Sequence, residues 1–375
     1  MLTEDQSFVL YLLKKSLGAV SNEADFEGVS AKAVEKAIVH SGIILTVFDL
    51  LPQNMKKDLE ETYFKTVKQS VLQSYEGERI LNALSSAGYG CMPLKGWELC
   101  KLYPRSVMRQ MADLDILVKP YEFDKIKKIM QDLGYSSGDE TSWMHDDFRY
   151  NEVTVEMHKR LTDDSKEIRA WEESVWDRAE KKENNIYTMS AEDVYIFHYV
   201  HLYKDFKNGS LGLRRIADGW LLDKQELDTQ FINEVFEKTG LTVFHKKMAD
   251  LSRACMGEIP LEPDHEILLN HAFEHGINGS DRSYKAGRIA SMSDKSMKRG
   301  KFRSFIAAVF LPFSRMKAQF PVLNKWPVLL PFCWLKRIFS LMRYAKENAS
   351  KLDYRNVQQK DYDEMKEFFR AGGIS

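Results

Sequence analysis

The segment Arg109-Gln-Met-Ala-Asp113-Leu-Asp115-Ile-Leu-Val118 decides the fold prediction. Its last six residues alternate acidic with apolar side chains over a strand-length run, which favours a β-strand. Because side chains two residues apart share one face of a strand, Asp113 and Asp115 would project together, opposite the apolar residues. Two aspartates at this spacing are equally typical of a solvated edge strand, so the neighbouring segments must decide between these interpretations.

The segment Val153-Thr-Val-Glu-Met-His158 shows the same alternation, with Glu156 and His158 on its polar face. It follows Phe148-Arg-Tyr150 across a short Asn-Glu turn, which suits a hairpin. Three carboxylates on neighbouring strands repel one another unless a divalent cation neutralises them, and oxygen ligands select Mg²⁺ or Mn²⁺. Such a cation implies phosphate chemistry. The alternative is that Glu156 and His158 form only the polar outer face of a surface hairpin.

Helical periodicity surrounds these strands. Apolar residues recur at helical spacing through the first 85 residues and again from Ser190 to about residue 275, while Pro120 begins a helix that ends near Gly134. We therefore expect an α+β fold, a mixed β-sheet flanked by helices, with helical N-terminal and C-terminal extensions. The expected regions are a helical N-terminal region (1–85), the sheet-containing core (86–165), a helical domain (166–275), a basic linker (276–303) and a basic helical C-terminal region (304–375).

Two further elements are candidates for phosphate binding. Lys95 and Gly96 follow a short strand and precede a helical pattern. They would therefore lie at a helix N-terminus, which attracts anions. A tight turn beside an exposed lysine explains the same pattern. Arg109 is ambiguous in the same way until it is placed beside the aspartates.

These elements in this order resemble the minimal nucleotidyltransferase-like family of the DNA polymerase β superfamily. The resemblance is carried by Pro93-Leu-Lys95-Gly96, Leu102-Tyr-Pro104, Arg109-x-x-x-Asp113-x-Asp115 and Val155-Glu156-Met-His158. It continues more weakly through His198-x-x-His201 and Leu213–Asp218. The sequence departs from the wider superfamily at Lys95-Gly96, where a Gly-Ser pair usually cradles the triphosphate, and at Lys159, where an aromatic residue often follows the histidine.

The resemblance implies Mg²⁺-dependent (or Mn²⁺-dependent) transfer of a nucleoside monophosphate from an NTP to a hydroxyl acceptor. Asp113 and Asp115 would hold the metal ions, and Glu156 would complete the metal site and could serve as base. The nucleotide would be bound by Lys95, Gly96, Arg109, His158, Arg214 and Arg215. Structural roles for His158 and for the two later arginines stay open, as does the acceptor: a sugar, an antibiotic, a protein side chain, a lipid-linked glycan or an RNA end.

Composition excludes several other classes. The 375 residues allow two or three packed units, and 44% hydrophobic with 29% charged residues argues against a disordered chain or a coiled-coil rod. Cys91, Cys100, Cys255 and Cys333 have neither zinc-site nor disulfide-framework spacing. The acidic opening of the sequence differs from a secretory signal, so we expect a cytoplasmic location.

The C-terminal region is strongly basic, although the whole chain has a formal net charge of −1. Its uncharged stretches are too short to span a bilayer. Residues 300–345 combine bulky apolar residues with cations, so they either pack on the acidic remainder of the chain or contact the inner membrane surface. Nucleic acid binding is not expected, because no binding motif accompanies the charge. Two alternatives to an enzyme remain: a non-catalytic nucleotide- or partner-binding protein, and a membrane-surface scaffold.

Overall fold

The computed structural model describes most of the chain. The described residues are 1–24, 26–138, 144–162, 166–293, 296–313, 316–317, 320–343, 354 and 356–374. Parts of each expected region from the core onward, except the helical domain, lie outside them: 139–143 and 163–165 in the expected core, 294–295 in the expected linker, and 314–315, 318–319, 344–353, 355 and 375 in the basic C-terminal region.

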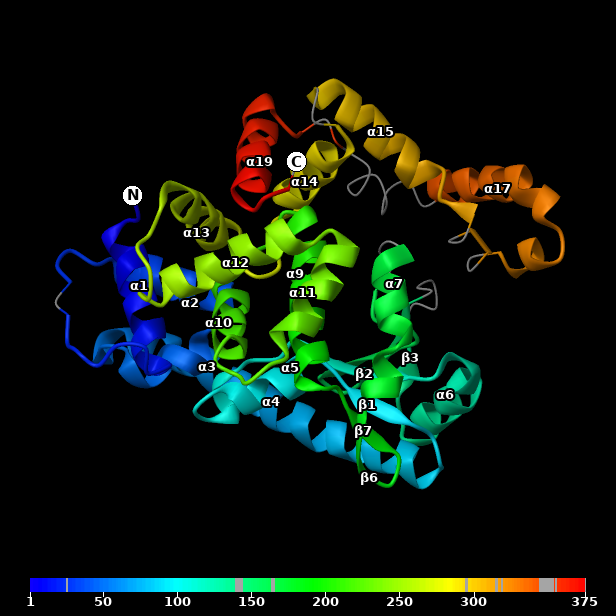
Figure 1. Cartoon of the computed structure of the whole chain (residues 1–375), viewed down its shortest axis with the longest axis horizontal. Helices are drawn as coiled ribbons and strands as arrows, with labels where there is room; N and C mark the ends of the chain where they lie inside the picture. The colour runs from blue at the N-terminus through cyan, green and yellow to red at the C-terminus, as the bar shows by residue number, and fades with distance from the viewer. Residues whose placement is uncertain are drawn as a thin grey trace.

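The described residues form an α+β structure with a mixed sheet and helical extensions at both ends, as the sequence predicts (Figure 1). The strands are β1 (Cys91–Pro93), β2 (Leu114–Val118), β3 (Ser136–Ser137), β4 (His145–Tyr150), β5 (Val153–His158), β6 (Glu180–Glu183) and β7 (Ile186–Thr188). The helices before and within the sheet are α1 (Glu4–Ser16), α2 (Ala31–Ser41), α3 (Ile44–Val47), α4 (Gln53–Ser86), α5 (Gly96–Leu99) and α6 (Phe123–Asp132). The later helices are α7 (Lys166–Glu173), α8 (Val175–Arg178), α9 (Ala191–Lys207), α10 (Leu213–Leu222), α11 (Thr229–Thr239), α12 (Thr242–Cys255), α13 (Pro263–His275), α14 (Asp281–Met292), α15 (Met297–Val309), α17 (Leu330–Arg343) and α19 (Gln359–Ala371).

The sheet has the strand order β3-β4-β5-β2-β1-β7-β6. Strand β2 runs parallel to β5, and β1 runs parallel to β7, whereas the other neighbours are antiparallel. The expected hairpin is confirmed: β4 and β5 pair directly, and Asn151 at the turn has a φ of 50°. Asparagine tolerates this left-handed conformation better than most residues do.

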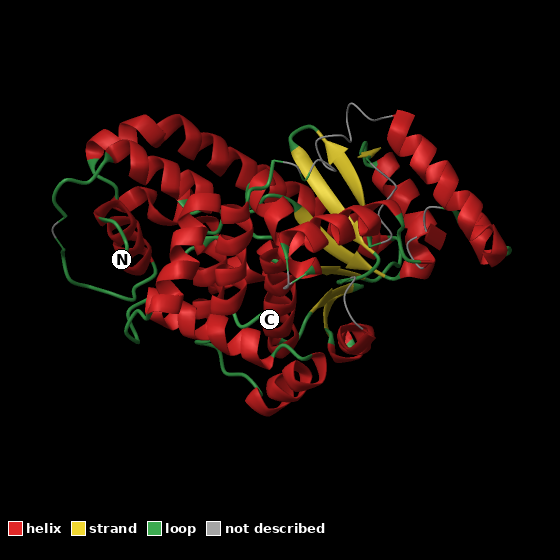
Figure 2. Cartoon of the chain, turned by 90° about the horizontal axis from the view of Figure 1, so that it is seen from above, coloured by secondary structure: helices red, strands yellow, loops and turns green. Residues whose placement is uncertain are grey.

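The two faces of the sheet have different partners. On one face, apolar side chains of β2 and β5 pack against α4 and α6 in a buried cluster that includes Ile80, Ile116, Ile126 and Val155. The opposite face carries the polar residues of the same strands and lies toward the helical part of the chain, where Leu117 joins the larger helical core. Figure 2 shows the strands beside this mass of helices. The alternation in the sequence thus becomes a division between an apolar and a polar face.

The helical part is one continuous core. Buried residues of α1 to α3 pack with those of α9 to α13 and of α19. Helix α9 begins where the sequence predicts, because the Ser190 hydroxyl accepts a hydrogen bond from the Asp193 amide. None of the described helices is long and apolar enough to cross a membrane.

Two segments differ from the sequence prediction. Residues 180–188, expected within a helical domain, contribute β6 and β7 to the edge of the sheet beside β1. Residues 276–303, expected as a linker without helical period, contain α14 and the start of α15, so that expectation is wrong there. Besides Ile289, helix α14 buries mainly small residues, Ser283, Ala286, Gly287 and Ala290, which follow helical spacing but give little apolar signal. A Cβ at Gly287 would lie 2.9 Å from the Lys207 carbonyl, so this close approach requires glycine.

The basic C-terminal region divides into two parts. Helix α19 packs on the helical core through residues such as Phe368, which stacks on Phe206. Helices α15 and α17 instead extend outward from α14 (Figure 1). Many of their large apolar side chains are exposed, so the interpretation that residues 300–345 pack on the remainder of the chain is wrong for those side chains.

Candidate active site

The three carboxylates singled out from the sequence line one cavity. In the parallel pairing of β2 with β5, Asp115 lies directly opposite Glu156. Asp113 precedes β2 and lines the same cavity of about 370 Å³. The strand alternation therefore brings the acidic residues together instead of leaving them on a solvated edge.

Of the three carboxylates, Asp115 has its negative charge most closely balanced by neighbouring positive groups. Its Oδ1 atom lies 2.5 Å from Lys95 Nζ and 2.8 Å from His158 Nε2. Burial alone would raise the pKa of Asp115, but Lys95 and His158 hold it well below its ordinary value. The lysine ammonium also lies 3.9 Å from Glu156, so it partly neutralises both acids.

Asp113 lacks a comparable ion pair among the described residues. Burial and the neighbouring Asp115 carboxylate raise the pKa of Asp113 to about 6. An excess of negative charge therefore remains at this end of the cavity, and a cation bound there would relieve it.

His158 connects the two strands. Its Nδ1 atom lies 3.1 Å from the Arg160 carbonyl, which can only accept, so this nitrogen carries a hydrogen. Its Nε2 atom faces both Asp115 and Glu156, the latter at 3.2 Å. Burial lowers the pKa of His158, but the hydrogen bonds to the two carboxylates outweigh burial and raise it. Such a ring, fixed through Nδ1, is the arrangement found in metal-ligating histidines.

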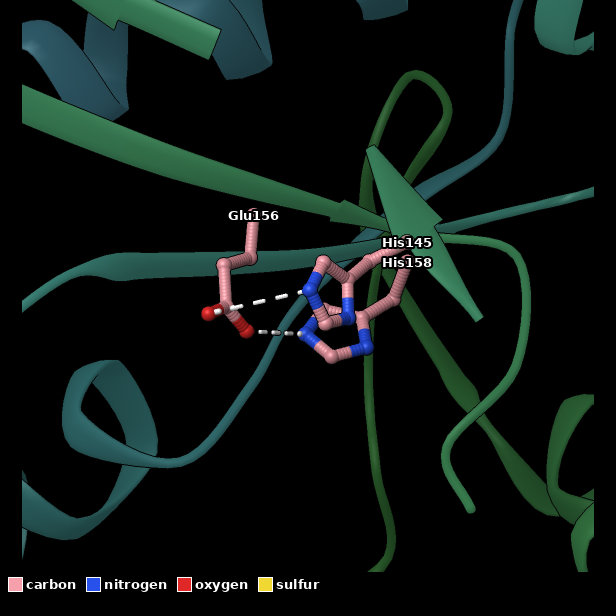
Figure 3. A group of neighbouring side chains, drawn as sticks. All are labelled: His145, Glu156 and His158. Atoms are coloured by element: carbon pink, nitrogen blue, oxygen red, sulfur yellow. Dashed lines mark hydrogen bonds and ion pairs between the residues drawn. The ribbon is translucent and has the colours of Figure 1, made fainter. Parts of the chain in front are cut away.

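His145 is a residue of the site that sequence reasoning missed. It lies opposite His158 in the β4–β5 pairing, and its Nε2 atom is 3.9 Å from Glu156 Oε1. Figure 3 shows the Glu156 carboxylate turned toward both imidazoles. One signal could have found it: because β5 has six residues, a hairpin partner of equal length begins at His145, not at Phe148.

The donor set fits a divalent cation. One ligand atom from each of His145, Glu156 and His158 lies within 4.8 Å of the others. Asp115 contacts the imidazole of His158. Carboxylate oxygens suit Mg²⁺ and Mn²⁺, whereas imidazole nitrogens shift the preference toward Mn²⁺ and later transition metals.

Arg109 lies at the cavity but is held by an unexpected partner. Its guanidinium donates two hydrogen bonds of 2.8 Å to the buried Asp218 carboxylate, which also accepts one from the Tyr103 hydroxyl. This contact ties the segment before β2 to helix α10.

The wall opposite the carboxylates is basic. Arg214 and Arg215 lie in the first turn of α10 and line the cavity. Arg215 is paired with Asp205, whereas Arg214 donates to the Gln110 carbonyl. Burial and the neighbouring Arg109 lower the pKa of Arg214 to about 10, and its Nε atom is buried without a partner among the described residues. A helix N-terminus with an incompletely satisfied arginine favours a bound anion.

The Lys95-Gly96 turn has a strained backbone. Lys95 has a φ of 45°, a conformation that non-glycine residues adopt rarely, and the helix that follows has only four residues. A Cβ at Gly96 would lie 2.6 Å from Met111 Cγ and 2.9 Å from an Arg109 nitrogen. The expected helix start is confirmed, yet with so short a helix its dipole is a minor contribution to phosphate binding.

The cavity gathers all nine site residues predicted from the sequence: Lys95, Gly96, Arg109, Asp113, Asp115, Glu156, His158, Arg214 and Arg215. His201 lines it as well, whereas His198 lies deeper in a small neighbouring cavity. Sequence reasoning missed other lining residues on the helical wall, among them Lys204, Asn208, Asn278 and Tyr284. They come from segments that carry no motif.

Comparison with known families agrees with this geometry. The model of a family described as an uncharacterised nucleotidyltransferase matches residues 29–257, more than half of the chain. The chain belongs to this family. The matched region contains the sheet and the arginines of α10, whereas α13 to α19 follow it. None of the curated proteins or solved structures compared with the chain matches it.

Proposed function

We propose that the chain is a metal-dependent nucleotidyltransferase that moves a nucleoside monophosphate from an NTP to a hydroxyl acceptor. The observation that carries this proposal is the pairing of Asp115 with Glu156 in a cavity whose opposite wall bears Arg214 and Arg215. Acids that can hold a cation, together with lysine and arginine side chains in the same cavity, suit a cation-bound triphosphate.

Each wall has its own role in the proposal. Asp113, Asp115 and Glu156 hold the cation, with His145 and His158 as additional donors. When bound, the cation neutralises charge on the phosphates and favours ionisation of the acceptor hydroxyl. Lys95, Arg109 and Arg214 orient the triphosphate, because guanidinium and ammonium groups bind phosphate oxygens through charge-assisted hydrogen bonds. Glu156 takes the proton of the acceptor hydroxyl.

Arg109 has fewer nitrogen atoms available for a phosphate than the sequence suggested. Two of its nitrogens are held by Asp218, and the remaining one lies beside Gly96. The ion pair orients the guanidinium before any ligand arrives, so little side-chain entropy is lost on binding.

The test uses the full chain with each α-labelled NTP, Mg²⁺ or Mn²⁺, and an extract that supplies the acceptor. Label should pass to one extract component, and Asp115→Asn or Glu156→Gln should reduce the transfer at least a thousandfold. Asp124→Asn is the matched control, because Asp124 is exposed on α6, which covers the other face of the sheet. The proposal would be contradicted if no extract component acquired label from any of the NTPs. Full activity of both site variants would contradict it as well.

A non-catalytic nucleotide-binding protein is the alternative from another class. This alternative would be favoured if the wild-type chain bound a labelled NTP at equilibrium but transferred no label to any extract component and released no pyrophosphate. The carboxylates argue against it, since a binding module has no need for three acids in one cavity.

A further inference from the structure

Helices α15 and α17 form an arm, residues 297–343, whose outer surface is apolar. The exposed large apolar side chains are Phe302, Phe305 and Ile306 on α15, Phe310 directly after it, and Phe332, Leu335 and Phe339 on α17. Between the helices, Val322, Trp326 and Val328 are also exposed. These ten side chains are 37% to 75% exposed, far more than chance placement of single residues explains.

The spacing gives each helix two distinct faces. On α15, the exposed residues follow helical spacing, while Gly300 and Ser304 on the opposite side pack against α14. A Cβ at Gly300 would lie 2.4 Å from the Ile289 carbonyl, so that inner face is in close contact. On α17, Cys333 and Trp334 form the inner face in a small cluster of their own. The inner faces are therefore satisfied, and the outer apolar faces are unpartnered among the described residues.

The arm is also free of acids. The chain contains no Asp or Glu between Asp294 and Glu347, whereas Lys and Arg recur throughout. Lys298, Arg299, Arg303, Lys325 and Lys336 are exposed beside the apolar residues. Because the whole chain has a net charge of −1, the remainder is acidic and the arm is its one strongly positive element. An anionic surface would attract the arm and repel the body.

We propose that this arm binds the surface of an anionic lipid bilayer, with its apolar face in the headgroup region. A bilayer surface accommodates a helix with bulky apolar side chains on one face and flanking cations. Each cation near anionic lipid adds to the affinity. The proposal does not depend on the enzymatic activity.

Other occupants fit the arm less well. Ile306, Val322, Val328 and Leu335 have no ring to stack on bases, which argues against a single-stranded nucleic acid. The core of a protein interface is depleted in lysine, whereas exposed lysines flank this surface.

The first test is flotation of the full chain with vesicles of phosphatidylcholine, with and without phosphatidylglycerol. The chain should float only with the anionic vesicles, and less as salt is raised. Lys298→Glu with Arg299→Glu and Arg303→Glu should weaken binding about a hundredfold, because each cation contributes roughly fivefold. Phe332→Ser with Leu335→Ser and Phe339→Ser should abolish flotation.

The controls match these variants in exposure and number. Helix α4 carries Phe64, Val71 and Tyr75 at 59% to 63% exposure, so their triple replacement by serine removes equal apolar area elsewhere. Charge reversal at the exposed Lys57, Lys65 and Lys68 of the same helix controls for net charge. Both controls should float like the wild type. Circular dichroism and the urea midpoint show whether each variant is folded.

A second measurement separates insertion from simple adsorption. Brominated lipid should quench a component of tryptophan fluorescence that is absent in Trp326→Phe. Equal flotation of the arm variants and the wild type would overturn the proposal, as would binding to neutral vesicles alone. Arm-dependent binding to RNA or DNA in a gel shift, or arm-dependent dimerisation in sedimentation velocity, without flotation would overturn it in favour of another occupant.

Discussion

Arg109 and Asp218 are 109 positions apart in the sequence, yet they form a buried ion pair with two hydrogen bonds of 2.8 Å. Burial would raise the pKa of Asp218, but the guanidinium of Arg109 outweighs burial and lowers it. The pair joins the sheet wall of the cavity to the helical wall. It therefore holds in register the two surfaces that the proposed reaction needs.

We expect Asp218→Asn to destabilise the fold by about 3–5 kcal/mol, because it leaves the Arg109 charge buried without a partner. Urea unfolding measures the change. Glu152→Gln breaks the exposed pair between Lys68 and Glu152 and should change stability by about 0.5 kcal/mol or less. If the two variants unfold at similar urea concentrations, the buried pair does not join the walls as described.

Asp113 gives the metal-free protein a pH-dependent stability. Its pKa is raised to about 6 from an ordinary value of 3.8, so the folded chain binds this proton more tightly than the unfolded chain does. Stability from this group is therefore full below about pH 4 and is lost as the pH rises through about 6. In EDTA and at a pH above neutral, Asp113→Asn should unfold at a higher urea concentration than the wild type. Near pH 4, the urea midpoints of the two proteins should be nearly equal. The exposed Asp124→Asn serves as control, and a gain of equal size at both pH values would contradict the assignment.

In the proposed function, Lys95 would compete with the cation for the same carboxylates, since its ammonium lies 2.5 Å from Asp115 and 3.9 Å from Glu156. Lys95→Met should therefore bind Mn²⁺ severalfold more tightly while its affinity for NTP falls. Titration of Mn²⁺ followed by electron paramagnetic resonance measures the first effect, and equilibrium binding of labelled NTP the second. Lys101→Met, which removes an exposed ammonium paired with Glu98, should change neither. Weaker Mn²⁺ binding by Lys95→Met would mean that Lys95 positions the acids instead of competing for them.

His145 should influence which cation the site prefers. An imidazole ligand favours Mn²⁺ over Mg²⁺, so His145→Ala should weaken Mn²⁺ binding about tenfold and Mg²⁺ binding less. Direct Mn²⁺ titration with Mg²⁺ competition measures both. His40→Ala, at an exposed histidine of α2, is the control. An equal loss of affinity for both ions would mean that His145 positions Glu156 and does not itself bind the cation.

The sequence by itself determined the central strands, the start of helix α9 and the polar face of the strands. The alternation around Asp115 and Glu156 depends only on the two-residue period of a strand. The N-cap at Ser190 depends on a hydrogen bond from the amide of Asp193, three positions later. Such local rules do not require knowledge of the rest of the chain. The family resemblance then supplied the proposed roles of the cavity residues.

Only the tertiary structure decided what those residues contact. The partner of Arg109 and the strands at 180–188 both depend on segments far apart in the sequence. Helix α14 was missed because most of the residues that it buries are small, and only Ile289 among them is a large apolar residue. Composition gave the arm its charge, but only packing shows that its bulky apolar residues face outward, because burial is a property of the assembled chain.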